Sequence, residues 1–501
     1  MVSSAQPLPA RFDPGTGENI AWSVPLGTET HSTPVVAGGR ILIGTNNGNP
    51  RDPRHEGDRG VLLCLRATDG SLLWQLVVPK RHEDDFFDWP KSGISSTATV
   101  EGDRAYLVDN RGVVLCLDLH GLADGNDGPF HNEAIYYAVQ PTNTLSQGAP
   151  APFRPDGSLL PGATEPARVE LGPLDADIVW MFDLSSGAGI WSHDAAHSSI
   201  LIHGNHLYLN TGTGVDNTHR RLRRPDAPSL VALDKRTGAY LARDNEGIGR
   251  TIFHSTWAPP SLGSFQGRPT LFFAAGNGFI YAFDPLPADT ASPAGPPLSL
   301  SCRWRWDFDP EAPKENVDRY MSNRGEGPSN FYGAPVPVGN RLFVAGGGDL
   351  WWGKNAAWLK CLDLSGTEPR QVWDYPVVRH TFSTPAVHGD VVYVTDTSQN
   401  LHAVEAPSGR PLWTHELKGE TWASPLVADG RVYVGTRRGW FHVLAAGREK
   451  EVVAEINLRS PISATAVAAN RTLYVATMDR LYAVRSGDRA PGALPGPSSR
   501  P

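Results

Sequence analysis

Four stretches of the chain repeat one pattern: HSTPVVAGGRILIGT (31–45), TFSTPAVHGDVVYVTD (381–396), TWASPLVADGRVYVGT (421–436) and PISATAVAANRTLYVAT (461–477). Each predicts a short strand, a tight turn rich in Gly, Asn and Asp, and a second strand of alternating β-branched and aromatic residues. A third strand and another turn follow, as in LLCLRATDGSLLW (62–74) and LHAVEAPSGRPLW (401–413). Such a repeat predicts successive four-stranded units.

One residue of each first strand serves as an anchor for the register. The anchors are Pro34, Ala98, Ile200, Pro260, Pro335, Pro385, Pro425 and Thr465. A Trp stands 12 residues before three of them (Trp22, Trp373 and Trp413) and marks the outermost strand of the preceding unit. The final unit ends with its third strand at 481–484. The segment NIAWSVPL (19–26), at the other end of the chain, can supply the missing fourth strand. We therefore predict an all-β fold, a closed eight-bladed β-propeller of four-stranded antiparallel blades.

The domain organisation follows from this register. We expect an N-terminal extension at 1–18, the propeller at 19–485 with an insertion at 120–176, and a disordered tail rich in Pro, Gly and Ser at 486–501.

Composition narrows the class of partner. The 501 residues carry 45 Lys and Arg against 53 Asp and Glu, a net charge of −8, which disfavours nucleic acid and anionic membranes. No apolar run approaches the roughly 18 residues that a membrane span needs. The opening residues MVSSAQPLPA show no signal peptide.

The phrase S-T-P-V-V-x-G-G-R, followed by G-x-L-x-W, resembles the repeat of the quinoprotein-type, PQQ-like β-propeller family over roughly residues 19–485. The resemblance implies the propeller fold and a periplasmic or secreted location. The family includes quinone-dependent dehydrogenases and barrel-assembly lipoproteins. We expect no bound pyrroloquinoline quinone, because the chain lacks the adjacent Cys pair of those dehydrogenases. The lipidated N-terminal Cys of the assembly lipoproteins also has no counterpart, since the first Cys is Cys64.

Long insertions gather in the loops that precede each first strand and follow each second strand, on one side of the ring that we call the top face. Insertions on a rigid scaffold commonly carry binding or catalysis. Three residues before the anchors, the register places a ring at the top of the central channel: His31, Ser95, His197, Trp257, Tyr332, Phe382, Trp422 and Ile462. This ring either fills the channel or forms a stacking platform for a ligand.

Polar and charged residues stand just outside this ring. They are Glu29, Asp194, His254, Ser255, Asn330, Arg379, His380, Glu420 and Arg459. From both sets we expect the ligand-binding residues His31, Asp194, Trp257, Asn330, Tyr332, Phe382, Arg379, Glu420 and Trp422, with His197, His254 and His380 as the candidates for acid–base catalysis. The spacing of the two His in HDAAH (193–197) matches no recognised zinc motif, and no metal site is predicted.

Three functions remain open. The first is binding of a small polar, saccharide-like ligand in the top funnel of the channel, whether or not it is an enzyme. The second is a non-catalytic scaffold that presents its top loops, with the aromatic pairs Phe86–Phe87 and Trp351–Trp352, to a protein partner. The third is a quinone-dependent dehydrogenase.

Overall fold

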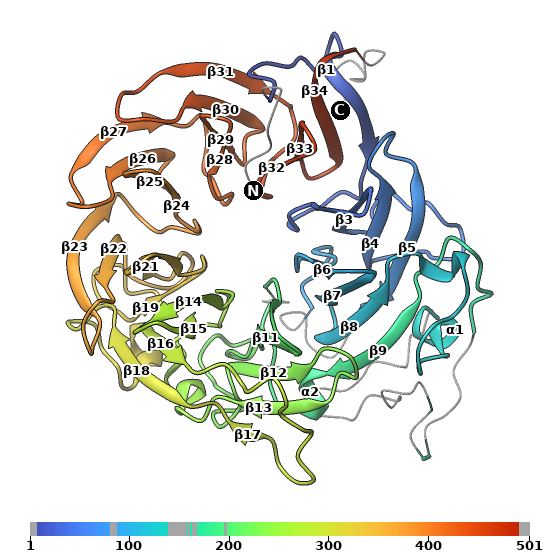
Figure 1. Cartoon of the computed structure of the whole chain (residues 1–501), viewed down its shortest axis with the longest axis horizontal. Helices are drawn as coiled ribbons and strands as arrows, with labels where there is room; N and C mark the ends of the chain where they lie inside the picture. Colours follow the sequence, from blue (N-terminus) through green and yellow to red (C-terminus); the bar gives the residue numbers. More distant parts are fainter. Residues whose placement is uncertain are drawn as a thin grey trace.

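The computed structural model describes residues 8–80, 88–138, 158, 161–162, 168–194 and 198–489. Within these residues, eight antiparallel sheets stand side by side around a central channel (Figure 1). The predicted eight-bladed propeller is thereby confirmed. His197, Phe86, Phe87 and part of the 120–176 insertion lie outside the described residues, as does the tail from 490 onward.

The first four blades follow the chain in order, each from its inner to its outer strand. Blade 1 consists of β2 (Val35–Ala37), β3 (Arg40–Asn46), β4 (Arg59–Arg66) and β5 (Leu72–Pro79). Blade 2 consists of β6 (Thr99–Glu101), β7 (Arg104–Val108), β8 (Val113–Asp118) and β9 (Ile178–Asp183). Blade 3 consists of β10 (Leu201–His203), β11 (His206–Asn210), β12 (Leu230–Asp234) and β13 (Tyr240–Arg243). Blade 4 consists of β14 (Ser261–Phe265), β15 (Arg268–Ala274), β16 (Phe279–Phe283) and β18 (Cys302–Asp307).

The remaining blades repeat the same order. Blade 5 consists of β20 (Val336–Val338), β21 (Arg341–Gly348), β22 (Ala357–Asp363) and β23 (Arg370–Val377). Blade 6 consists of β24 (Ala386–His388), β25 (Val391–Asp396), β26 (Asn400–Glu405) and β27 (Pro411–Glu416). Blade 7 consists of β28 (Leu426–Ala428), β29 (Arg431–Gly435), β30 (Trp440–Ala445) and β31 (Val452–Asn457). Blade 8 consists of β32 (Val467–Ala469), β33 (Thr472–Ala476), β34 (Arg480–Arg489) and β1 (Glu18–Pro25).

Short elements complete the blades and their loops. The strand β17 (Leu298–Ser299) adds to β13 in parallel, and β19 (Ser329–Asn330) adds to β21. The described helices are single turns: η1 (Gly121–Ala123), α1 (Glu133–Tyr136), α2 (Leu184–Gly187), η2 (Ile248–Thr251) and η3 (Val317–Tyr320). Among the described residues, no helix has the length and apolar character to cross a membrane.

The ring closes through its two ends. β1 pairs antiparallel with β34 at the outside of blade 8, as the sequence predicts (Figure 1). Residues ahead of β1 add to this joint, because the Phe12 ring packs edge-on against Phe441 of blade 7, with 5.9 Å between centroids. The closed ring leaves no blade with an open neighbour.

A tryptophan contact joins neighbouring blades. Trp22, in the outer strand of blade 8, donates its indole N–H to the carbonyl of Ala67 in blade 1 at 3.2 Å. The same contact recurs along the chain, in the pairs Trp74 to Leu119, Trp180 to Lys235, Trp373 to Ala406 and Trp413 to Gly447. Each indole is thus satisfied while its rings fill the seam between two blades.

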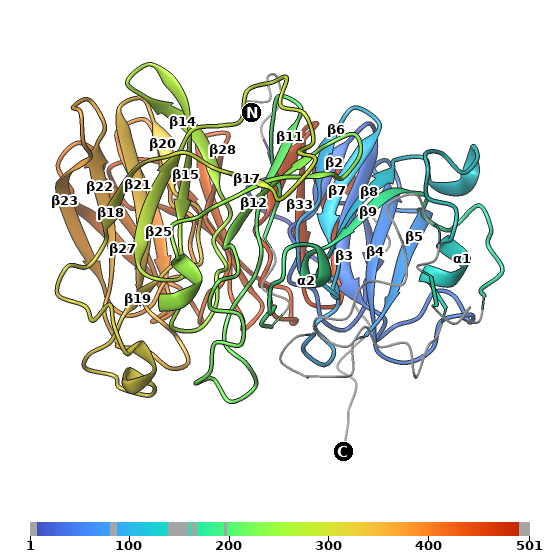
Figure 2. The ribbon, with the colours of Figure 1, turned by 90° about the horizontal axis from the view of Figure 1, so that it is seen from below.

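The long loops of the top face extend from one side of the ring, the lower side in Figure 2. They include the loop between β11 and β12 and the loop between β18 and β19, which holds η3. These loops surround the end of the channel where the first strands begin.

Candidate functional site

A cavity of about 1250 Å³ opens at the top end of the central channel. Its wall combines the residues that precede the inner strands with residues of the inserted loops. They are Thr28, Glu29, His31, Trp89, Ser92, Ser95, Asp194, His219, His254, Trp257, Tyr332, Trp351, Trp352, Phe382, Trp422, Arg437, Ser460, Pro461, Ser463, Met478 and Asp479. Its size suits a small molecule or a short peptide segment.

One side of the cavity is a continuous aromatic arc. Trp257 of blade 4 stacks on Tyr332 of blade 5 with 4.9 Å between ring centroids, and Tyr332 contacts Phe382 of blade 6 at 4.2 Å. Phe382 stacks on Trp422 of blade 7 at 5.1 Å, and Trp422 stacks on His31 of blade 1 at 6.0 Å. Five blades therefore contribute one ring each to a continuous row of stacked and tilted rings.

A loop residue covers this arc. Trp351 lies between β21 and β22 and contacts the rings of Trp257, Tyr332, Phe382 and Trp422, with centroid distances of 5.8 to 6.2 Å. Trp351 is still 39% exposed, although it contacts these four rings and also the ring of His254. Trp351 therefore gives the mouth of the cavity an apolar contact surface.

A buried cluster of imidazoles adjoins the arc, with the His254 ring 4.9 Å from the Trp257 ring. His254 Nε2 lies 2.8 Å from His193 Nε2, and the His219 ring lies 5.0 Å and 5.2 Å from the rings of His193 and His254. His193 Nδ1 lies 2.7 Å from the carbonyl oxygen of Val215. The three histidines come from three separate loops of blades 3 and 4.

Asp349 connects the imidazole cluster to the aromatic arc. Its Oδ2 lies 2.8 Å from His254 Nδ1 and accepts a hydrogen bond of 2.8 Å from the Tyr332 hydroxyl. Burial alone would raise the pKa of Asp349, but the charge and hydrogen bond of His254, with the Tyr332 hydroxyl and the Trp352 amide, lower it to about 2. Asp349 is therefore a buried carboxylate that orients one ring of each set.

Burial also sets the charge of the imidazoles. Burial, followed by the proximity of His254 and His219, lowers the pKa of His193 well below its usual value. Burial, followed by the proximity of His254, also lowers the pKa of His219. Both rings are therefore neutral near pH 7.

The local backbone explains how these loops meet. Single β-bridges join Ser192 to Thr213 and Gly214 to Ser255, so the inserted loop after β11 lies against the entries to blades 3 and 4. Gly214 is required there, because a Cβ on it would lie 2.5 Å from the carbonyl oxygen of His254. Asp194 and His219 have φ of +55° and +57°, a conformation that costs most side chains about 1 kcal/mol or more and recurs at functional sites.

The structure brings together most of the residues that the register places at the channel mouth. Those that line the cavity are His31, Ser95, Asp194, His254, Trp257, Tyr332, Phe382, Trp422 and Glu29. His197 lies outside the described residues. Ligand binding by this set stays a prediction.

Four predicted site residues do not line the cavity. Asn330 is buried in β19, where pairing with β21 holds it in the sheet. Arg379 is exposed to solvent, and the neighbouring His380 is buried with its Nε2 2.9 Å from the carbonyl oxygen of Lys354. Glu420 accepts a 2.7 Å hydrogen bond from the indole of Trp422 and so orients that ring, although Glu420 itself does not line the cavity.

Sequence reasoning missed the residues that the inserted loops carry to the cavity. His219 and Asp349 are the main ones. The pair Trp351–Trp352 was expected only as a surface for a protein partner, and His193 was noted only for its spacing from His197. No repeat positions them, since each lies in an insertion present in one blade. The available signal was the concentration of His, Asp and Trp in the top loops.

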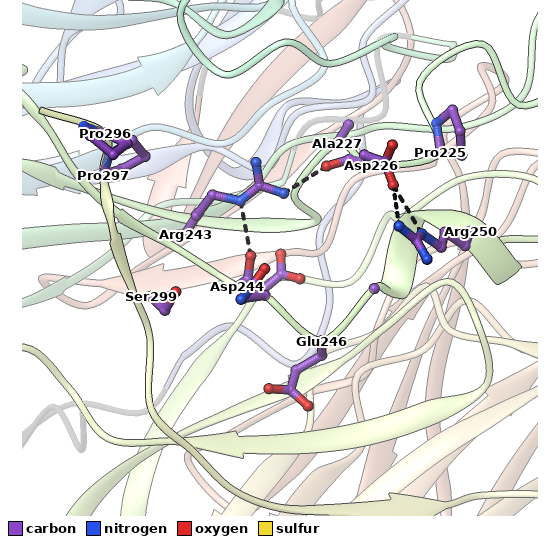
Figure 3. A pocket seen from close by; sticks show the side chains of 12 residues that line it. Pro225, Asp226, Ala227, Arg243, Asp244, Glu246, Arg250, Pro296, Pro297 and Ser299 are labelled. Carbon is purple, nitrogen blue, oxygen red and sulfur yellow. Dashed lines mark hydrogen bonds and ion pairs between the residues drawn. The ribbon is translucent and has the colours of Figure 1, made fainter.

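A second pocket of about 670 Å³ lies between the outer part of blade 3 and the loop that precedes η2 (Figure 3). Arg243 donates to the carbonyl oxygens of Asp226 and Asp244, and Arg250 forms a 2.8 Å ion pair with Asp226 (Figure 3). Both arginines of this pocket are thus engaged by protein oxygens, which makes it a weaker candidate than the channel cavity.

Comparison with known proteins places the chain in a family. A family model described as outer membrane protein assembly factor BamB matches residues 7–125 and 355–488. The BamB of Legionella pneumophila (strain Paris) is 42% identical over 52 residues, which is 10% of this chain and 14% of that protein. The match therefore spans only a small part of the length of that relative.

The comparison with solved structures finds similar folds at low identity, and the first of the two below supports the propeller architecture. BamB from Moraxella catarrhalis superposes with a TM-score of 0.52 at 14% identity, covering 93% of this chain and 97% of that one. The computationally designed Ika8 protein superposes with a TM-score of 0.48 at 9% identity, covering 93% of this chain and 99% of that one. Since the family model matches half of the chain and the fold agrees, the chain belongs to the PQQ-like β-propeller family whose model is described by BamB.

Proposed function

We propose that the protein is a non-catalytic scaffold that binds a polypeptide partner on its top face during outer membrane protein assembly, in the periplasm or outside the cell. The observation that carries the proposal is the family match, because the matched model and the curated relative are both described as outer membrane protein assembly factors. The net charge of −8 agrees with a protein partner rather than nucleic acid.

The geometry suggests where such a partner binds. Trp89 and Trp351 are 44% and 39% exposed at the mouth of the cavity, and exposed aromatic residues that border a pocket dominate many protein interfaces. The aromatic arc behind them offers a site into which one apolar side chain of the partner can insert. The top face thus combines a pocket for one apolar side chain with exposed aromatic residues around its opening.

Binding to an outer membrane polypeptide, diluted from denaturant onto the immobilised full chain, tests the proposal. We expect Trp351→Ala and Trp89→Ala each to weaken binding about tenfold, because interface tryptophans commonly contribute more than 1 kcal/mol. Val338→Ala is the control, since Val338 is 45% exposed at the opposite end of blade 5, as the last residue of β20 before the turn to β21. Equal affinity of all four proteins would contradict a top-face interaction.

The cavity itself favours a second function, binding of a small polar or saccharide-like ligand against the aromatic arc. A thermal-shift screen of saccharides distinguishes the two. A ligand at 100 times its Kd adds about 2.7 kcal/mol to the free energy of unfolding. Stabilisation by a saccharide that Trp257→Ala abolishes, without binding of any polypeptide, would favour the second function over the first.

A further inference from the structure

Three buried imidazoles form the strongest chemical feature of the cavity wall. One ring nitrogen from each of His193, His219 and His254 lies within 4.8 Å of the other two. His219 and His254 border the cavity, whereas His193 stands behind them, fully buried. The cluster is therefore buried, and two of its three rings line the channel cavity.

Hydrogen bonding fixes the tautomers of two of these rings. His193 Nδ1 faces the carbonyl oxygen of Val215, and His254 Nδ1 faces the carboxylate of Asp349. Both oxygens can only accept, so both rings carry their proton on Nδ1. Their Nε2 atoms, which lie 2.8 Å apart, then present lone pairs to each other. Two facing lone pairs repel unless a cation, either a proton or a metal ion, lies between them.

We propose that His193, His219 and His254 bind a divalent transition-metal ion, with a remaining coordination position directed toward the cavity. Imidazole nitrogen is a preferred ligand of Zn²⁺ and its neighbours in the first transition series. The Nε2 atoms of His193 and His254 need to separate by about half an ångström to accept two metal bonds of about 2.1 Å in tetrahedral geometry. Asp194, whose Oδ2 lies 3.4 Å from His193 Nε2, offers a carboxylate beside the same position.

The surroundings of the three rings match those of protein metal sites. Histidine ligands typically donate their second ring N–H to a carboxylate or a backbone carbonyl, which fixes the ring orientation. Asp349 has this role for His254 and the Val215 carbonyl has it for His193. Tyr332 in turn donates to Asp349, so the support continues into the aromatic arc.

Two other groups of His and acidic residues in the described part of the chain contact protein cations and donors. In the group of His415, His442 and Glu455, the Lys418 ammonium pairs with Glu455 and the Lys418 amide donates to His442 Nε2. In the group of Asp52, His55 and Asp175, Arg54 pairs with both carboxylates. Protein cations and donors already occupy those groups.

The cluster lies in a part of the chain that the family model does not match. All three histidines and Asp349 fall between the two matched segments, 7–125 and 355–488, of the family model. The inference therefore stands independently of the proposed scaffold function.

Titration of the chelator-treated full chain with Zn²⁺ by calorimetry tests the site, and Co²⁺ provides a spectroscopic readout. We expect one tightly bound ion per chain and the intense visible absorption of a four-coordinate cobalt centre. His219→Ala should weaken binding at least tenfold, and Asp349→Asn should weaken it about 10- to 100-fold through loss of ring orientation. His442→Ala, which removes an imidazole from another buried His pair, is the matched control and should leave affinity unchanged.

The wild-type titration keeps the test decisive even if a variant fails to fold. A folded wild-type chain that binds no stoichiometric Zn²⁺ and gives only the weak spectrum of hexa-aqua Co²⁺ would overturn the proposal. That outcome would mean that a proton, not a metal ion, bridges the two Nε2 atoms. Binding that His219→Ala leaves intact but His442→Ala abolishes would place the ion at the other cluster and equally overturn it.

Discussion

Asp177 illustrates what burial does to a single ionisable residue in this fold. The residue is 1% exposed and immediately precedes β9, the outer strand of blade 2, where its Oδ2 accepts a 2.8 Å hydrogen bond from the Asp127 amide. Burial, helped by the negative charge of Glu133, raises the pKa of Asp177 to about 7. The folded protein thus holds a proton that the unfolded chain releases near pH 4.

We predict that Asp177→Asn makes stability less sensitive to pH. Between about pH 4 and pH 7 the unfolded wild-type residue ionises while the folded one stays protonated, so rising pH lowers the free energy of unfolding. The advantage of the variant should grow through this window by a few kcal/mol, at about 1.4 kcal/mol per pKa unit, and then level off above pH 7. Urea unfolding at several pH values measures it.

Asp103→Asn, at a position with a 79% exposed side chain, is the control and should track the wild type. A constant difference between Asp177→Asn and the wild type across pH 4 to 8 would show that Asp177 titrates alike in both states.

At the scale of elements, the contact between an outer-strand tryptophan and the next blade holds neighbouring sheets together. Trp22 packs over Gly70, whose φ is +73°, and a Cβ on that glycine would lie 2.7 Å from the indole. The sequence pattern of Trp and of Gly in the turn after the third strand predicts both positions, although not the indole hydrogen bond to the Ala67 carbonyl.

We predict that Gly70→Ala destabilises the protein more than Gly39→Ala. Both glycines have φ near +75°, so both variants incur the cost of a left-handed alanine, about 1 to 2 kcal/mol. Only Gly70→Ala also collides with Trp22, since nothing lies within 4 Å of a Cβ at Gly39. Overpacking of this kind adds about 1 to 3 kcal/mol, which chemical denaturation resolves. An equal decrease in the free energy of unfolding for the two variants would mean that Trp22 moves away from residue 70 without a measurable cost.

The difference between repeated strands and single inserted loops shows why the candidate site was only partly predictable. Residues at a fixed distance from a repeat anchor, such as Trp257, Tyr332 and Phe382, converge because the ring symmetry brings equivalent positions together. His219 and Trp351 lie in loops that occur once, and their positions depend on long-range contacts such as the Gly214–Ser255 bridge. Arg379 has the correct register, yet its side chain turns to solvent, because register fixes the backbone and not the rotamer.

At the scale of the whole molecule, the closure of the ring depends on one strand pair. Ile20 and Leu26 are fully buried, and Ile20 and Trp22 belong to the apolar cores on the two sides of blade 8. The sequence predicts this closure, because the last repeat is one strand short and the first residues supply a strand with the correct tryptophan.

We predict that deleting residues 1–25 lowers the melting temperature and broadens the unfolding transition. Without β1, the edge of β34 is unpaired, and the apolar cores that contain Ile20 and Trp22 are exposed to solvent. Thermal unfolding followed by circular dichroism measures the effect. Truncation after Arg489, which leaves β34 and the other described strands intact, is the control. A sharp transition at the wild-type temperature in the N-terminal deletion would show that the ring does not need β1.

The pairing of β1 with β34 also has a consequence for the newly synthesised chain. The Asn19 side chain accepts a hydrogen bond from the amide of Gly487, 468 residues later. At about 5 to 20 residues per second, a ribosome takes roughly 25 to 95 s to add that length. Throughout that interval the first strand to emerge has no partner, and it must avoid aggregation and proteolysis until the last strand of the protein appears.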